Sequence, residues 1–440
     1  MIRSKFYLVG IFIITLCVFV PKTNFISNSE GKEIKSNVLT LLTTNDAFRV
    51  EWYQVWGGNY SEYGRKVALD LSGSVYVVGF TWSFGEGYAD MCLVKYDNSG
   101  NQQWNRTWGG TGFDYGNAVA IDTSGDVYIA GYTDSFSKGY NDMCLVKYDK
   151  NGIQQWNCTW GGAGQDFCNA LAIDLSNNVY LAGHSDDNIV LVKYNENGVQ
   201  QWNCTWDSGS GDYGWDLAID SLGNLYIAGT EVALSEKGES HDMILIKYDE
   251  NGIQQWNRTW GGAGDESGEA VVVDSSDNVY LAGGTESFGV EKSAMVLIKY
   301  NNDGILQWNH TWDTNNPDFG YGVAVDSLNS IYLTGSSGNF AVNDGQIVLV
   351  KYDGNGVQQW NYTWGGDKND ESFGIIVDSS GNIYLTGDTE SFGTGDNNMI
   401  LVKFSSYTEP KPLIPGYNLY MIIGILGIIS LLLMKRPPKR

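Results

Sequence analysis

The chain has 440 residues and a formal net charge of −24, with 51 Asp and Glu against 27 Lys and Arg. This balance excludes nucleic acid and anionic lipid as main partners, because both require a basic protein face. It is compatible with a cation-rich exterior.

The first predicted element is an N-terminal apolar segment, residues 1–22. Arg3 and Lys5 precede an apolar run from Phe6 to Val20, which is the layout of a secretory signal. Residues 23–47 are expected to form a linker.

From residue 48 to residue 404 the sequence repeats with a period near 50 residues. The motif WNxTW, preceded by LVKYDxNGxQQ, opens six copies at Trp104, Trp156, Trp202, Trp256, Trp308 and Trp360. EWYQVW, with Trp52 and Trp56, is a degenerate first copy. A period of this length built from short strands indicates a β-propeller or another repeat array.

One repeat predicts four antiparallel strands, here named A to D. In the second copy they are residues 117–122, 127–132, 143–148 and 154–160, separated by clusters of Gly, Asn, Asp and Ser. Such a unit is one propeller blade.

The number of blades follows from the motif LVKY or its variants. It occurs seven times, at Leu93, Leu145, Leu191, Leu245, Leu297, Leu349 and Leu401. The seventh unit stops at Phe404 without a strand D, and residues 48–56 can supply that strand and close the ring. We therefore predict an all-β fold, a seven-bladed β-propeller of four-stranded blades that the N-terminal strand closes in blade 7.

The repeat resembles a known family. WGG, an acidic residue, D-x-S-G-N-x-Y-x-x-G-x-T and D-x-x-L-V-K are similar to the seven-bladed β-propeller repeats (SBBP type) of bacterial and archaeal surface proteins. The resemblance covers residues 48–404 and implies the propeller fold, but it implies little about activity.

The C-terminal part predicts a membrane anchor. Residues 405–417 form a linker, residues 418–434 a transmembrane helix, and residues 435–440 a basic tail that is expected in the cytoplasm. The segment PLIPGYN resembles the C-terminal PGF-type anchors of archaeal surface proteins. We expect a single-pass protein of the cell membrane with an extracellular propeller.

Strand order places the D-to-A and B-to-C loops on one face, where loop lengths vary and function is expected. An acidic residue lies eight residues before the Asp that ends each strand A. Because strand A is innermost, these carboxylates should ring the mouth of the central channel; they are Glu62, Asp114, Asp166, Asp212, Glu266, Asp318 and Asp370. We favour caps of loop N–H groups, which need no cofactor, and the alternative is a cation site that would hold Ca²⁺.

A second candidate site lies between blades 3 and 4. Blade 3 has a short B-to-C loop and blade 4 a long one, which predicts a notch on the rim. A metal or ligand site there would use His184, Asp186, Asp187, His241 and Asp242, and the alternative is ordinary loop variation.

Strand D carries N-x-T in six copies, and a loop carries one more sequon. Glycosylation and duplication of a structural Asn explain these sites equally well; the residues are Asn59, Asn105, Asn157, Asn203, Asn257, Asn309 and Asn361.

Counting across the C-to-D turn places Cys144 opposite Cys158 and Lys147 opposite Gln155. A disulfide between Cys144 and Cys158 is therefore one alternative, although buried free thiols are the simpler interpretation. We interpret the repeated Lys of LVKY as part of a structural polar ladder.

For function we expect a binding, adhesion or scaffold protein for a surface protein or glycan, without catalysis. Four arginines and three scattered histidines lie in the propeller, which does not favour sialidase-type or general-base chemistry. The alternative is a carbohydrate-active enzyme with its site on the D-A/B-C loop face.

Overall fold

The computed structural model describes residues 23–27, 33–37, 47–235, 238–289, 292–339 and 342–407. The chain divides into two units, residues 1–39 and residues 40–440. In the first unit, β1 (Thr23–Ser27) and β2 (Glu33–Asn37) pair antiparallel, within the segment where the sequence predicts a linker. The predicted signal and the predicted transmembrane helix lie outside the described residues. No helix in the described ranges is long and apolar enough to span a bilayer.

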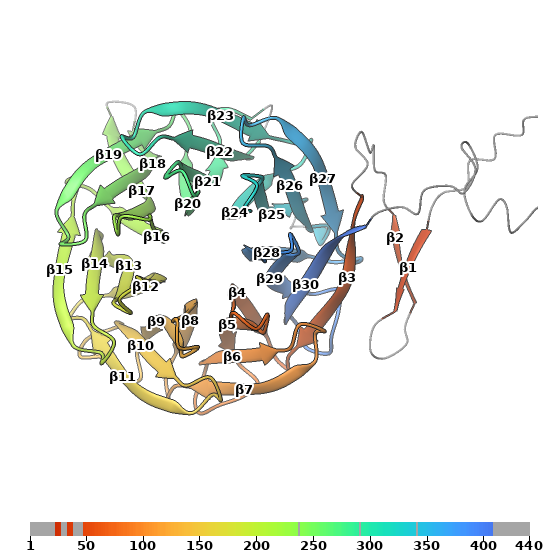
Figure 1. Cartoon of the computed structure of the whole chain (residues 1–440), viewed down its shortest axis with the longest axis horizontal. Coiled ribbons are helices and arrows are strands. Elements are labelled where there is room, and N and C mark those ends of the chain that lie inside the picture. Colours follow the sequence, from red (N-terminus) through yellow and green to blue (C-terminus); the bar gives the residue numbers. More distant parts are fainter. Residues whose placement is uncertain are drawn as a thin grey trace, which may run out of the picture. The chain divides into compact units, whose positions relative to one another are not determined.

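The second unit is the predicted seven-bladed propeller. Figure 1 shows seven four-stranded sheets around a central opening, each with strand A innermost and strand D on the rim. Blades 1 to 6 follow one another along the chain from β4 to β27, and blade 7 contains β28, β29, β30 and β3.

The strands occupy equivalent positions in every blade. The A strands are β4 (Glu62–Leu69), β8 (Asp114–Ile121), β12 (Asp166–Ile173), β16 (Asp212–Ile219), β20 (Glu266–Val273), β24 (Asp318–Val325) and β28 (Asp370–Val377). The B strands are β5 (Val75–Thr81), β9 (Val127–Thr133), β13 (Val179–Ser185), β17 (Leu225–Ser235), β21 (Val279–Thr285), β25 (Ile331–Ser337) and β29 (Ile383–Thr389).

The C strands are β6 (Asp90–Tyr96), β10 (Asp142–Tyr148), β14 (Asn188–Tyr194), β18 (Gly238–Tyr248), β22 (Ala294–Tyr300), β26 (Gln346–Tyr352) and β30 (Asn398–Tyr407). The D strands are β7 (Gln102–Trp108), β11 (Gln154–Trp160), β15 (Gln200–Trp206), β19 (Gln254–Trp260), β23 (Leu306–Trp312), β27 (Gln358–Trp364) and β3 (Ala47–Trp56).

The hydrophobic core lies between neighbouring blades. One cluster joins Tyr76 and Leu93 of blade 1 to Ile129 and Val146 of blade 2, and equivalent clusters follow around the ring. The B strands are buried on both faces because they lie mid-blade between two neighbours. The D strands, by contrast, are largely exposed. A single blade therefore leaves two apolar faces that its neighbours must cover.

Ring closure in blade 7 is confirmed. β3 pairs with β30 antiparallel, with Val50 opposite Phe404 and Trp56 opposite Met399. This pairing completes the fourth strand that the last repeat lacks and leaves no gap in the ring.

In five blades the repeated lysine donates a hydrogen bond to the next blade. Lys95 Nζ lies 4.8 Å from the centre of the Tyr76 ring, and the Tyr76 hydroxyl donates to Asp70 at 3.1 Å. Lys95 also donates to the carbonyl of Lys150, in the C-to-D turn of blade 2. The same lysine–tyrosine contact recurs in every blade, as expected for a structural polar ladder.

The predicted register between strands C and D is wrong by one residue. Cys144 lies opposite Thr159, and Lys147 lies opposite Trp156 rather than Gln155. The reason is a bulge at the start of strand D, which inserts one unpaired residue after the turn. Cys144 and Cys158 are not bridged, and all five described cysteines are free thiols.

Candidate functional site

The seven ring carboxylates begin the seven A strands. Each is at most 3% exposed and accepts a hydrogen bond from the backbone N–H four residues earlier, as Asp114 does from Gly110 at 2.8 Å. In four blades a threonine at the end of strand B bonds the same carboxylate. This is the geometry of a loop cap.

The cation site at this ring stays a prediction. Within the described residues, no group of three or more His, Cys, Asp or Glu side chains is arranged to hold a metal ion.

The residues of the predicted notch lie in two separate segments, a tight turn of blade 3 and a long hairpin of blade 4. Asp186 and Asp187 form a two-residue turn with positive φ angles of 43° and 70°, between Ser185 and Asn188, which pair with each other. Blade 4 uses its longer segment to extend β17 and β18 into a hairpin. His184 lines the central cavity, whereas His241 lies in the extended hairpin of blade 4, where its Nδ1 is 3.1 Å from Asp265. Both histidines line one pocket.

Each A strand carries a bulge three residues after its ring carboxylate. The bulged residue has no partner on strand B, as the register shift around Arg65 in β4 shows. A bulge redirects a side chain out of the regular pleat. All seven bulged residues line the central cavity; they are Arg65, Asn117, Asn169, Trp215, Glu269, Tyr321 and Phe373.

A continuous row of rings follows the channel wall through blades 1 to 4. We call it the aromatic belt, and it consists of Tyr63, Phe80, Tyr115, Tyr132, Phe167, His184 and Tyr213. Neighbouring ring centroids lie 4.4 to 5.0 Å apart. The members alternate between the residue after the ring carboxylate on strand A and its partner on strand B. In blades 5 to 7 the same positions hold Ser267, Gly284, Phe319, Ser336, Glu371 and Asp388, so the belt covers one side of the channel.

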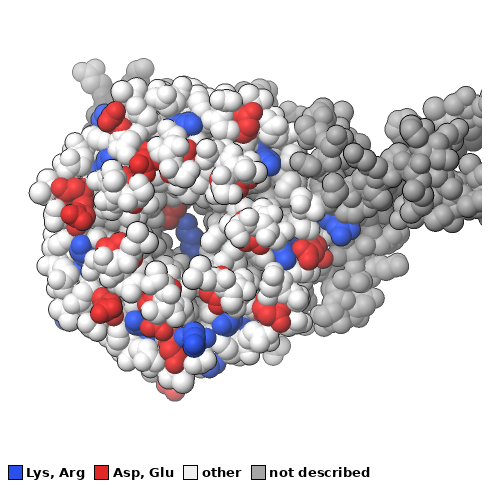
Figure 2. Space-filling view, in the orientation of Figure 1, with Lys and Arg blue, Asp and Glu red and all other residues white. Residues whose placement is uncertain are grey.

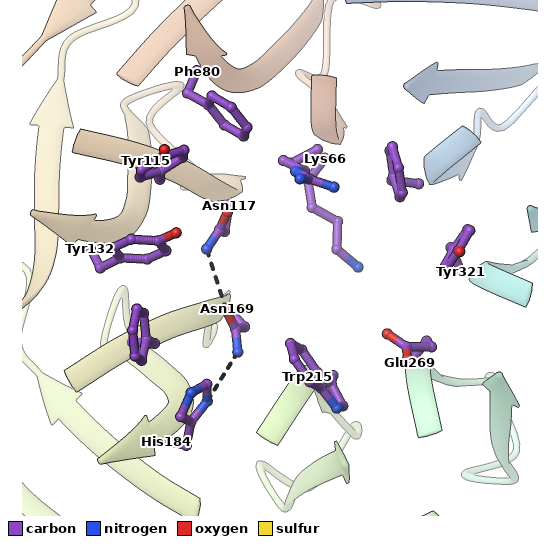
Figure 3. A pocket seen from close by; sticks show the side chains of 13 residues that line it. Lys66, Phe80, Tyr115, Asn117, Tyr132, Asn169, His184, Trp215, Glu269 and Tyr321 are labelled. Atoms are coloured by element: carbon purple, nitrogen blue, oxygen red, sulfur yellow. Dashed lines mark hydrogen bonds between the residues drawn. The ribbon is translucent and has the colours of Figure 1, made fainter. Parts of the chain in front are cut away.

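The belt and the bulged residues enclose a cavity of about 450 Å³ in the centre of the ring. Figure 2 shows the opening, with Lys or Arg atoms visible inside it. In Figure 3, Lys66 extends across the space toward Trp215 and Glu269. Lys66 Nζ lies 3.1 Å from Asp216 Oδ1, so an ion pair joins blade 1 to blade 4 across the channel. Lys66 and Asp216 both directly follow the bulged residue of their A strands. At this position the other five blades have Ala or Gly.

Two of the bulged residues have structural roles. Asn117 donates to the carbonyl of Cys168, and Asn169 donates to that of Gly214, each in the following blade. Asn169 Nδ2 also lies 3.5 Å from His184 Nδ1. Burial among these rings lowers the pKa of His184 to about 4, so the imidazole is neutral near pH 7.

Two acidic residues occupy the belt positions of blade 7. Glu371 and Asp388 lie opposite each other in blade 7, and the buried Asp388 Oδ1 has no hydrogen-bond partner among the described residues. Burial raises the pKa of both groups, and the charge of Arg65 opposes that shift. The Arg65 guanidinium lies over the Phe373 ring at 4.6 Å. Unbonded polar groups beside aromatic walls are typical of ligand sites.

The sequence prediction missed this lining. Residue variation among the repeats could have indicated it. The glycine two residues after the ring carboxylate recurs in five blades, whereas the next residue differs in almost every blade.

The sequon asparagines of strand D lie on the outermost strands. Five are exposed and Asn257 is half-buried, while the loop residue Asn59 is exposed. The six strand D asparagines are on the outer edge of their sheets, and the central cavity is lined by residues of strands A and B.

The fold and the central cavity define a seven-bladed β-propeller with a pocket in its channel. Residues 160–189 and 359–392 match the family model of the SBBP β-propeller repeat. The chain therefore carries SBBP-type repeats in a closed seven-bladed ring.

Two curated proteins have similar segments. The regulatory protein FlaEY of Caulobacter vibrioides is 28% identical over 149 residues, which are 28% of this chain and 16% of that protein. An uncharacterised WD repeat-containing protein, L264, of Acanthamoeba polyphaga mimivirus is 27% identical over 120 residues, which are 22% of this chain and 9% of that protein. The matches thus span a small part of either relative.

Solved structures show the same fold at low identity. A polysaccharide lyase of the PL25 ulvan lyase family superposes with a TM-score of 0.52 at 13% identity, covering 79% of this chain and 95% of the lyase. The WD40 domain of Pan2 from Neurospora crassa gives a TM-score of 0.50 at 9% identity, covering 84% and 98%.

Proposed function

We propose that this protein is a binding module that holds a saccharide in the central cavity, without chemistry of its own. The observation that supports this proposal is the aromatic belt beside an open cavity of about 450 Å³. Sugar rings stack on aromatic faces, and their hydroxyls need polar partners that are not already bonded within the protein. In this cavity Trp215 supplies an aromatic face, and Arg65 and Glu269 supply polar groups, of which Glu269 already accepts one hydrogen bond from Ser267.

The proposed setting is the cell surface, with the propeller outside and a C-terminal membrane anchor. Residues 1–22 and 418–434 support this setting through their sequence. A surface protein as partner is the second kind of ligand that the sequence favours.

The test is a glycan array with the purified protein, followed by calorimetry on each saccharide that binds. Trp215→Ala should weaken binding at least about tenfold, since aromatic contacts at a binding site contribute on the order of 1–3 kcal/mol. The matched control is Tyr140→Ala, because Tyr140 is 70% exposed and lies outside the cavity lining. Equal binding by both variants would rule the cavity out.

A carbohydrate-active enzyme is the second candidate, and the Glu371–Asp388 pair is the observation that favours it. Two carboxyl groups beside a sugar site can act as acid and base. One of the solved relatives is itself a polysaccharide lyase, at an identity that shows only the fold. Incubation of each bound polysaccharide should release no new reducing ends. Turnover that Asp388→Asn abolishes, with the melting temperature unchanged, would favour the enzyme instead.

A further inference from the structure

The aromatic belt is interrupted at blade 5, and a second cavity of about 420 Å³ opens there. We call it the blade 5 pocket. Blade 5 contributes Ser267 and Gly284 at the two belt positions, so it places no aromatic ring at this part of the channel wall. The pocket shares His184, Trp215 and Glu269 with the central cavity. A ligand in the central cavity can therefore extend into it.

Two pairs of aromatic rings flank this interruption. Tyr213 and Trp215 come from blade 4, with centroids 6.3 Å apart and planes 24° apart. Phe319 and Tyr321 come from blade 6, with centroids 6.2 Å apart and planes 10° apart. Between them stands Glu269, the bulged residue of blade 5; Figure 3 shows it between Trp215 and Tyr321.

The lining of the blade 5 pocket is acidic. It contains four carboxylates and, among the described residues, no Lys or Arg. Two of the four are engaged: Glu266 caps its loop, and Asp265 pairs with His241. Glu269 and Glu286 form no ion pair with a described residue. Ser267 donates a hydrogen bond to Glu269, and the charge of Lys66 lowers the pKa of that carboxyl, but the ion pair of Lys66 is with Asp216 at 3.1 Å.

We propose that the blade 5 pocket selects a saccharide with a protonated amino group, with Glu269 as the ion-pair partner and Trp215 and Phe319 as the walls. This inference rests on the proposed saccharide binding and specifies its ligand. A carboxylate that lacks a protein cation gains most from an ammonium group that arrives with the ligand. Aromatic faces add a favourable cation–π contact.

A bare metal ion fits the pocket less well than an ammonium group. The described residues provide no set of three ligating side chains, and aromatic walls offer a metal ion no oxygen ligands. The walls instead match an organic cation, which has both apolar surface and charge.

The test compares hexamers of glucosamine and N-acetylglucosamine, which differ in charge at nitrogen, by calorimetry on the full chain at a pH where the amines are protonated. The glucosamine hexamer should bind about tenfold more tightly, and Glu269→Gln should remove that preference. Trp215→Ala should weaken both ligands. Glu196→Gln is the control, because Glu196 is an exposed residue of the β14–β15 turn, away from the pocket.

Each outcome separates the two proposals. Equal binding of both hexamers, tighter binding of the acetylated one, or a preference that survives Glu269→Gln would overturn the amine site and leave saccharide binding in place. If neither hexamer binds, but Ca²⁺ alone raises the melting temperature and Glu269→Gln abolishes that rise, the pocket is a cation site and the amine proposal fails. Binding of neither hexamer, with no effect of Ca²⁺, would also overturn the amine site, and the glycan array then decides saccharide binding separately.

Discussion

Carboxylates in this propeller differ in their hydrogen-bond partners, and this difference distinguishes acids with a structural role from acids that are free to bind a ligand. Asp122 accepts hydrogen bonds from Ser124 and Asp126 in its own turn, and Asp114 is bonded on both oxygens. Asp388 Oδ1, by contrast, is buried and has no hydrogen-bond partner among the described residues. The ring and turn carboxylates are therefore satisfied within the fold, whereas Asp388, whose belt position carries no acid in the other blades, keeps a buried oxygen without a partner among the described residues.

His184 gives a pH dependence that can be measured at a single residue. Its pKa is about 4 in the folded protein, because burial disfavours the charged ring, and its ordinary value is 6.5. The unfolded chain therefore binds more protons between these values, and the folded state loses stability as the pH falls through that window. Since the ring is only partly buried, we expect a loss of about 1–3 kcal/mol.

His184→Phe should remove this part of the acid sensitivity, because Phe and Tyr occupy the equivalent position in blades 1 and 2. Urea unfolding at several pH values between 7 and 4 compares the two proteins. Parallel curves for both would show that the imidazole does not titrate differently on unfolding.

At the scale of the element, two kinds of bulge decide what the sequence can predict. The number of blades, the strand order and the ring closure could be predicted from the repeat, because each copy shows the same pattern of strands and turns. The register of strand D did not, since a bulge inserts one residue that a simple count across the turn passes over. The channel lining was missed for the same reason, because the bulge on strand A turns residues such as Trp215 and Glu269 toward the channel.

Closure by β3 predicts how a truncated chain behaves. Removal of residues 47–56 leaves β30 and the facing side of blade 7 with an unpaired edge and exposes its apolar surface. The truncated protein should aggregate or lose cooperative unfolding in thermal melts followed by circular dichroism.

The control is a chain that starts at residue 57 and carries residues 49–56 after Phe404, joined by the turn sequence DKNG that blade 2 uses, so that five residues separate Phe404 from Val50 as in blade 2. It should melt cooperatively, because blade 7 is complete again. If the plain deletion melts like the intact protein, closure contributes little to stability.

At the scale of the whole molecule, the six strand D sequons lie at intervals around the circumference of the ring. The channel and the pockets lie at its centre, so glycans on the rim would leave the ligand site open. We predict modification of the exposed members, with Asn257 the least occupied because its side chain is half-buried. Mass spectrometry of glycopeptides from native protein gives the occupancy of each site. Six unmodified asparagines would mean that the motif is a duplicated structural feature.

The β3–β30 ladder has a mechanical consequence. Ala47 pairs with Tyr407 at one end of an antiparallel ladder, so the chain enters and leaves the ring at the same end of the same two strands. A pulling force applied through those two ends would load the ladder one residue pair at a time, as in opening a zipper, rather than all pairs at once. The other six blades carry no share of that load until the seam has parted. The joint that completes the ring is thus also the place where tension would first open it.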